Sequence, residues 1–391
     1  MQIDYIIGNE EQMRRMTTIG AWKPFDSRVV DFCGEISKKL LLAENCQKYP
    51  DLVSLAFWLR RSNVQKISRD YADMENRLGR GLVFHIAPGN VALSFAYSLA
   101  TGLLTGNTNI LRLPSRKFEQ ADIFCEVLKQ VLADYPEMAQ RLCLIKYPHD
   151  KELTDELSMM CHTRIIWGGN DTIDVIRQSP IRPRTTEITF ANRFSICLIN
   201  ADEYLDKYDS KKTAHDFYND TYLTDQNACS SPRIIFWYGK EIQAAQKVFW
   251  EALHNEIQKY DMAPVTTVNK MLTFCKFAAE NQCGLSIEKD YRIMRIGVDN
   301  IGPELLESIG NSGYFYECEI ADIREILPIC TWELQTLSYI GFDSEELCKT
   351  ILDNAPYGVD RVVPVGNTMN FSFIWDGRDI VREMTRMISG Q

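Results

Sequence analysis

The sequence predicts an α/β protein with two doubly wound domains and a helical region at its N-terminus. Three observations lead to this fold class. The 391 residues are enough for two substantial domains. Short apolar segments alternate with longer segments of helical periodicity, as in parallel sheets whose strands are joined by helices. The apolar segments lack a polar face, which is typical of strands that are covered on both sides.

The first eighty residues are expected to be helical. Residues 29–44 and 52–67 repeat apolar side chains at helical spacing, and Asp26 with Ser27 is a suitable cap for the first of them. Four strand–helix pairs then follow, at 81–87 and 91–104, 109–113 and 118–135, 142–147 and 151–160, and 163–169 and 171–178.

A second α/β block is predicted from residue 194 onward. It contains strands at 194–200, 233–239 and 336–343, helices at 241–260 and 344–355, a strand at 361–366 and a closing helix at 379–390. We therefore expect a first domain at 1–189, a second at 190–357, and a segment at 358–391 that returns to the first.

Composition narrows the class of protein. The net charge of −10 argues against nucleic acid or an anionic membrane as the main partner. The twelve cysteines include no C-x-x-C pair and the chain has only five histidines, which disfavours structural zinc. The first sixteen residues lack the apolar core of a signal peptide, so a cytoplasmic protein with reduced thiols is expected.

One segment, residues 86–111, contains no charged residue and is long enough to span a membrane. Its proline, glycines and asparagines instead predict a buried helix between two turns, and no transmembrane segment is expected.

Three turns are candidate ligand sites. Pro88, Gly89 and Asn90 follow a strand, and ligands of α/β proteins bind at the carboxyl ends of strands. Asn90 can donate to an oxyanion or simply cap the next helix. Residues 106–117 end a later strand in basic residues, which suit a nucleotide or a solvated strand end.

The third turn contains Gly168 and Gly169 between a strand and a helix. Paired glycines let backbone N–H groups approach a pyrophosphate closely, whereas Asp171 beside them is a better helix cap than a phosphate neighbour. The sequence has no G-x-G-x-x-G, so the usual dinucleotide fingerprint is absent.

Cys229 differs from the other cysteines because it lies in a polar turn of small residues, within the segment from Leu223 to Arg233, between a helix and a strand. Such surroundings suit a nucleophile, since access and nearby N–H dipoles favour a thiolate. The alternative is an inert buried cysteine.

Taken together and in this order, three segments resemble the acyl-CoA reductase family of the bacterial bioluminescence fatty-acid reductases, a branch of the aldehyde dehydrogenase superfamily. They are FHIAPGNVALSFAYSLATGLLTGNTNILRLPS, DQNACSSPRIIFW and RVVPVGNTMNFSFIWDG. The resemblance runs from about Gly79 to Gly377 and implies an aldehyde dehydrogenase-like fold with a cofactor domain followed by a catalytic domain.

The resemblance also implies roles for individual residues. Cys229 takes the place of the nucleophile that carries the acyl thioester, and Asn90 that of the oxyanion-hole asparagine. The cofactor, NADPH or NADH, is expected at residues matching the superfamily's ribose and pyrophosphate contacts: Arg112, Pro114, Ser115, Gly168, Gly169 and, with a poor local match, Glu333.

One departure from the superfamily is informative. Aldehyde-oxidising members carry a glutamate that activates water to hydrolyse the thioester, but here Glu187 is out of register and Thr189 occupies the place. An acyl reductase benefits from losing that base, because water would consume its activated substrate. The general acid is not identified; His215 is a candidate.

These features predict that a thioester on Cys229 is reduced to an aldehyde. The expected substrate is an acyl-CoA or an acyl carrier, with an acyl-protein synthetase as a possible partner and a homo-oligomer by analogy. The alternatives are an oxidative aldehyde dehydrogenase, an acyl-phosphate reductase, or an acyl-holding protein without hydride transfer. Phe95 and Tyr222 can line an acyl tunnel or pack a core.

Overall fold

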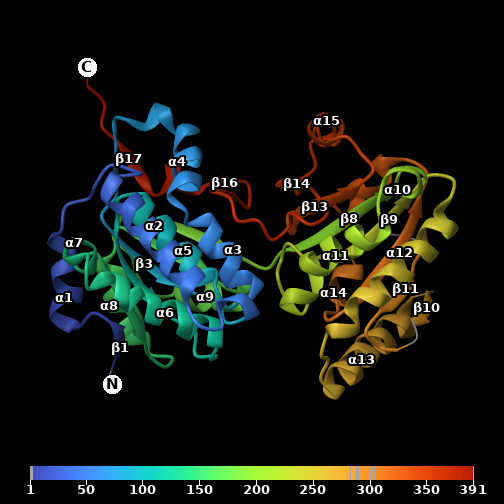
Figure 1. The fold of residues 1–391 in the computed structure, drawn as a ribbon, viewed down its shortest axis with the longest axis horizontal. Helices are drawn as coiled ribbons and strands as arrows, with labels where there is room; N and C mark the ends of the chain where they lie inside the picture. The colour runs from blue at the N-terminus through green and yellow to red at the C-terminus, as the bar shows by residue number, and fades with distance from the viewer. Residues whose placement is uncertain (1–2, 282, 288–289, 300–301, 303, 391) are drawn as a thin grey trace. The chain divides into compact units, whose positions relative to one another are not determined.

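The computed structural model divides the chain into two compact units, shown in Figure 1. Unit 1 is Met1–Ala191 with Phe371–Gln391, and unit 2 is Asn192–Asn370. The structure describes residues 3–281, 283–287, 290–299, 302 and 304–390. Among these residues no helix is long and apolar enough to cross a membrane, and no cluster of metal-ligating side chains occurs.

Unit 1 is built on a six-stranded sheet in the order β1-β5-β4-β3-β6-β7. The strands from β3 to β7 pair in parallel, and β1 lies antiparallel along β5. The chain winds from β3 through β4 to β5 and then crosses to β6 on the other side of β3, so the winding reverses between β3 and β6. The bounds are β1 (Asp4–Ile7), β3 (Leu82–Ile86), β4 (Thr108–Arg112), β5 (Leu142–Lys146), β6 (Thr163–Trp167) and β7 (Thr186–Phe190).

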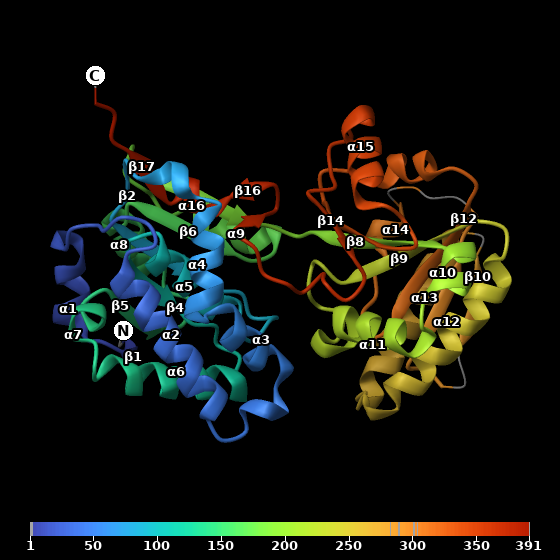
Figure 2. The same cartoon turned by 45° about the horizontal axis from the view of Figure 1, so that its top comes forward.

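Helices cover both faces of this sheet (Figure 2). One face packs on α2, α3, α5 and α6, and the other packs on α1, α8 and α9. Leu144 of β5 faces the first group and Ile145 the second, which explains why this strand is apolar from Leu142 to Ile145. The helices are α1 (Glu10–Arg15), α2 (Ser27–Leu42), α3 (Pro50–Trp58), α4 (Arg61–Arg69), α5 (Ser94–Leu104), α6 (Glu119–Leu132), α7 (Pro136–Ala139), α8 (Lys151–Met160) and α9 (Asn170–Arg177).

In the N-terminal region, the predicted cap at Asp26 is confirmed and the single helix predicted at 52–67 is not. Asp26 caps α2 as expected, because its side chain accepts a hydrogen bond from the Arg28 N–H. The single helix predicted at 52–67 is wrong: it is two helices, α3 and α4. The chain leaves the helical conformation at Arg60, and the Asn63 side chain bonds to the Trp58 carbonyl oxygen at 2.8 Å.

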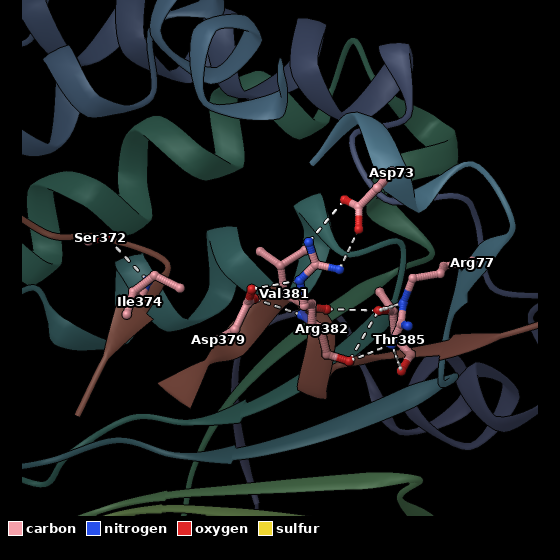
Figure 3. Close-up of polar contacts among 8 residues, drawn as sticks. All are labelled: Asp73, Arg77, Ser372, Ile374, Asp379, Val381, Arg382 and Thr385. Atoms are coloured by element: carbon pink, nitrogen blue, oxygen red, sulfur yellow. Dashed lines mark hydrogen bonds and ion pairs between the residues drawn. The ribbon is translucent and has the colours of Figure 1, made fainter. Parts of the chain in front are cut away.

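The C-terminal segment returns to unit 1 as a strand (Figure 3). β17 (Thr385–Met387) pairs antiparallel with β2 (Arg77–Gly79). Arg77 donates to Thr385 Oγ1 at 2.8 Å and to the Arg382 carbonyl oxygen at 2.8 Å. The closing helix predicted at 379–390 is therefore wrong beyond α16 (Ile380–Glu383), because the backbone after that one turn pairs with β2.

Unit 2 is built on a seven-stranded sheet in the order β10-β11-β12-β9-β8-β13-β14. All its neighbouring strands are parallel except β10 and β11. The bounds are β8 (Phe194–Asn200), β9 (Pro232–Tyr238), β10 (Gly284–Ile287), β11 (Met294–Gly297), β12 (Tyr314–Ile320), β13 (Leu334–Ile340) and β14 (Arg361–Pro364).

The unit 2 sheet is also covered on both faces. One face packs on α10 (Ala201–Lys207), α11 (Ser210–Thr221) and α12 (Ile242–Glu256). The other packs on α13 (Pro264–Glu280), α14 (Glu304–Glu307) and α15 (Ser344–Asn354). Both units are thus doubly wound, as the alternation of strands and helices predicted.

Residues 358–370 remain in unit 2, although the sequence placed them with the returning segment. β14 extends the unit 2 sheet by pairing with β13. The buried carboxylate of Asp220 then accepts hydrogen bonds from the N–H groups of Gly366 at 2.6 Å and Thr368 at 3.1 Å. These bonds attach the segment to α11, and the chain leaves unit 2 only after Asn370.

Candidate active site

In unit 1, the topology brings the three predicted turns to one edge of the sheet. β4, β3 and β6 are adjacent and parallel, so the turns that follow them share the carboxyl edge. The winding reverses between β3 and β6, and open α/β sheets bind their ligands outside the strand ends at such a reversal. The turns after these two strands, at 87–90 and 168–169, flank this point.

Asn90 lies exposed in the turn after β3. Helix α5 begins at Ser94, with Leu93 in the cap position. The alternative that Asn90 merely caps this helix is therefore wrong, and the oxyanion role stays a prediction.

Gly168 and Gly169 form the connection between β6 and α9. Gly169 holds the cap position of α9 and has no side chain to occupy the first turn, so backbone N–H groups define that end of the helix. A Cβ atom at Gly168 would meet Thr172 Cγ2 at 3.1 Å. Asp171 lies inside the first turn and is not the cap that the sequence suggested. The turn thus fits a phosphate group.

Arg112 ends β4 and is held by Tyr147. Its guanidinium donates to the Tyr147 carbonyl oxygen at 3.3 Å and lies 4.4 Å from the centre of the Tyr147 ring. Pro114 is half-buried, whereas Ser115 is exposed. These three residues therefore form the end of one strand and the start of its turn, where a ligand can reach Ser115.

A buried polar network, which sequence reasoning missed, lies beneath these turns. Trp167 Nε1 donates to Ser98 Oγ at 3.1 Å, and Ser98 Oγ lies 2.8 Å from His85 Nδ1. His85 Nε2 lies 2.9 Å from Asn109 Oδ1. Asn109 Nδ2 donates to the Asn107 carbonyl oxygen at 3.1 Å, so Oδ1 faces the ring and accepts the Nε2 proton. The neutral ring then accepts from the Ser98 hydroxyl at Nδ1. Burial lowers the pKa of His85 to about 4, although the bond to Asn109 opposes the shift.

Glu187 on β7 is engaged in ion pairs. Its carboxylate accepts from Arg164 Nε at 2.9 Å and from Arg177 Nε at 2.8 Å. Burial acts to raise the pKa of Glu187, but hydrogen bonds from the two arginines lower it overall. A carboxylate held in this way is a poor general base. Thr189, on the same strand, is half-buried and has no ionisable group.

In unit 2, Cys229 lies half-buried in the turn before β9. The turn has a fixed backbone: Asp225 and Gln226 both have positive φ angles, 52° and 58°. The buried Gln226 side chain accepts from the Gly313 N–H at 3.0 Å and donates to the Pro232 carbonyl oxygen at 2.9 Å. These bonds secure both ends of the segment that carries the cysteine.

Two side chains from other strands contact Cys229. Ser195 Oγ donates to the Cys229 carbonyl oxygen at 2.6 Å, and Gln335 Nε2 donates to Cys229 Sγ at 3.5 Å. The residues come from the amino ends of β8, β9 and β13, which are neighbours in the sheet. The thiol therefore lies at the edge of the unit 2 sheet where these parallel strands begin. The turns of unit 1, in contrast, follow the ends of their strands.

Arg233 supplies positive charge beside this turn. Its guanidinium donates to the Gln226 carbonyl oxygen at 2.6 Å and to that of Gly310. Burial lowers the pKa of Arg233 to about 10, and interaction with Cys229 opposes this shift. The guanidinium thus stays charged at neutral pH and favours negative charge on the sulfur.

Of the other residues that the sequence singled out, Glu333 and His215 are exposed, whereas Phe95 and Tyr222 are buried. Glu333 is exposed, and its carboxylate accepts from Thr331 Oγ1 at 2.7 Å. His215 lies exposed on α11, where Nδ1 is 2.9 Å from Glu256 Oε1. Phe95 and Tyr222 are both buried in hydrophobic cores, which favours the packing alternative over an acyl tunnel.

The site can be set beside known proteins. A sequence profile of the family described as acyl-CoA reductase (LuxC) matches residues 24–294, more than half of the chain. The chain belongs to this family.

Curated relatives of this LuxC-family chain carry one name, long-chain acyl-protein thioester reductase. The Photorhabdus laumondii protein is 25% identical over 324 residues, covering 79% of this chain and 63% of its own length. The Photorhabdus luminescens protein is 24% identical over 401 residues, covering 97% and 78%. The chain thus spans less than two thirds of the length of the first relative, and 58% of the Aliivibrio fischeri protein.

Solved structures show that the LuxC-family chain has the aldehyde dehydrogenase fold. An NAD-dependent benzaldehyde dehydrogenase from Corynebacterium glutamicum superposes with a TM-score of 0.65 at 12% identity, covering 96% of this chain and 86% of that one. A Thermus thermophilus 1-pyrroline-5-carboxylate dehydrogenase mutant gives 0.63 at 11%, covering 98% and 86%. These structures confirm the predicted fold class, and the profile match confirms the predicted family.

Proposed function

We propose that the protein reduces an acyl thioester to an aldehyde through an acyl-enzyme on Cys229. The observation that carries this proposal is the setting of Cys229: a half-buried thiol on a rigid turn, with an amide donor at its sulfur and the half-buried Arg233 interacting with its charge. Such groups favour a thiolate nucleophile. Membership of the acyl-CoA reductase family and the names of the relatives supply the reaction class.

In the proposed reaction, the Cys229 thiolate attacks the substrate carbonyl. The Cys229 N–H stabilises the oxyanion, and the thiol of the donor departs with a proton. A nicotinamide cofactor, when bound, would supply the hydride that reduces the acyl-enzyme. The thiohemiacetal anion on Cys229 then collapses, which releases the aldehyde and returns Cys229 as the thiolate.

The residues of unit 1 fit the cofactor. The turn at Gly168 and Gly169 would hold its pyrophosphate, and Arg112 with Ser115 would hold the adenosine ribose. The engaged state of Glu187 supports reduction over hydrolysis, because this carboxylate is already paired with two arginines.

The test follows NADPH and NADH oxidation with acyl-CoAs of graded length, and measures aldehyde formation and the intact protein mass. We expect turnover in wild type, loss of turnover and of the acyl adduct in Cys229→Ser, and no change in Cys348→Ser, an exposed cysteine of the same unit. Unchanged aldehyde formation in Cys229→Ser would refute the proposed nucleophile.

The cofactor site has its own test, which also separates a reductase from an acyl-holding protein. Gly168→Val places a branched side chain where Thr172 already lies close. We expect about tenfold weaker NADPH or NADH binding without substrate, and unchanged acylation of Cys229. Equal cofactor affinity in the variant would show that this turn is not the pyrophosphate site.

A further inference from the structure

Strand β13 carries an extra residue at the point where it meets β8. Leu334 pairs with Phe194, and Thr336 pairs with the next residue of β8, Ser195, so Gln335 forms a β-bulge. Bulges of this kind redirect a side chain and are frequent beside active sites. Gln335 is 0% exposed, so its amide must find partners inside the protein.

The contacts of the Gln335 side chain define its orientation. The Thr336 hydroxyl donates to Gln335 Oε1 at 3.3 Å. The amide nitrogen then faces Cys229 Sγ at 3.5 Å. The Asp360 N–H donates to the Gln335 carbonyl oxygen at 2.8 Å, so the backbone of the bulge is held as well.

Ser195 connects the bulge to the turn that carries the thiol. Its hydroxyl donates to the Cys229 carbonyl oxygen at 2.6 Å and accepts from the Thr336 N–H at 3.2 Å. The Ser195 side chain therefore joins the backbone of Cys229 to that of Thr336, the residue that follows Gln335.

We propose that Gln335 is a positioning residue for Cys229, which directs the sulfur and stabilises its thiolate through the amide N–H. This inference rests on the proposed function, in which Cys229 is the nucleophile. A neutral amide suits both steps of that reaction. A carboxylate at the same place would repel the thiolate and would offer water a general base against the thioester.

The test measures alkylation of Cys229 by iodoacetamide against pH, on the full chain without substrate, with the modified peptide quantified by mass. A hydrogen bond from the Gln335 amide stabilises the charged thiolate, so Cys229 in Gln335→Met is expected to react about tenfold more slowly at neutral pH. The curve of alkylation rate against pH moves to higher pH. Gln335→Glu, which keeps the shape of the side chain, moves it further in the same direction.

Ser338→Ala is the matched control. Ser338 is buried on the same strand and donates to the Ile196 carbonyl oxygen at 3.0 Å, so its loss perturbs β13 without removing the contact to Cys229. We expect its alkylation profile to match wild type. A control that shifts as much as Gln335→Met would assign the effect to loosening of the strand and overturn the inference.

A second readout is the lifetime of the acyl-enzyme without cofactor. We expect faster hydrolysis in Gln335→Glu than in wild type, and no acceleration in Gln335→Met. If wild-type Cys229 reacts no faster than the exposed Cys348, the proposed nucleophile fails. If it reacts fast but Gln335→Met and Gln335→Glu leave the profile unchanged, only the role of Gln335 fails.

Discussion

The buried histidine beneath the unit 1 turns makes stability depend on pH. His85 is fully buried, and its two ring nitrogens contact Ser98 and Asn109. Asn109 Oδ1 accepts the Nε2 proton and the Ser98 hydroxyl donates to Nδ1, so the network matches a neutral imidazole. A protonated ring would direct a second N–H at Ser98, and the serine proton would need another acceptor.

The size of the effect follows from the two pKa values. Burial lowers the folded-state pKa of His85 to about 4, from 6.5 in the unfolded chain. As the pH falls, His85 is protonated in the unfolded chain before it is protonated in the folded protein. The contribution of neutral His85 to folding stability is therefore complete above pH 6.5 and is lost as the pH falls toward 4. Between about pH 7.5 and about pH 5 the expected loss is about 2 kcal/mol.

The assay compares urea unfolding of wild type and His85→Gln at these two pH values. His85→Gln destabilises the protein at the higher pH, but it lacks the ionisable ring. The difference in unfolding free energy between the two proteins is therefore expected to shrink by about 2 kcal/mol at the lower pH. His149→Gln, at an exposed histidine of the same unit, is the control. A difference that stays constant with pH would refute the reasoning.

Three further predictions concern packing and hydrogen bonds. Glu317 accepts from two buried indoles and from Arg295, so Glu317→Ala is expected to cost about 3–5 kcal/mol in urea unfolding. Gly102→Ala would place a Cβ atom 1.9 Å from Asn109 Oδ1, and a lower melting temperature with a loss of about 1–3 kcal/mol is expected. Arg77→Ala removes the hydrogen bonds that hold the C-terminal segment, which should accelerate hydrogen exchange in β17.

Local sequence patterns located β3 to β6 of unit 1 and β8, β9, β13 and β14 of unit 2, but not β7, β10, β11, β12 or α13. Each strand from β3 to β6 contains a short apolar run and is followed by a helix, so these strands could be located without knowledge of their partners. β1 and β17 were missed for a common reason. Each depends on a partner distant in the chain, β5 and β2 respectively, and the local pattern of 379–390 resembles a helix.

The candidate site was predicted unevenly. Cys229 stood out because a polar turn around a cysteine is a local property. Gln335 did not stand out, since its role follows from a bulge that only the pairing of β13 with β8 reveals. One signal was available: a glutamine in a strand whose other residues are mainly apolar must be buried with a partner. His85 gave a similar signal between Phe84 and Ile86.

The thiol contacts and the proposed cofactor turn lie in different units, which has a chemical consequence. Gln335 contacts the Cys229 thiol and Ser195 contacts the Cys229 carbonyl oxygen, and both belong to unit 2, whereas the turn at Gly168 and Gly169 belongs to unit 1. The two partial reactions should therefore respond to different substitutions. We expect Cys229→Ser to bind cofactor as wild type does, and Gly168→Val to accept the acyl group at the wild-type rate. If either variant lost both activities, thiol activation and cofactor binding would be coupled, and Cys229 would owe its reactivity to more than the contacts within its own unit.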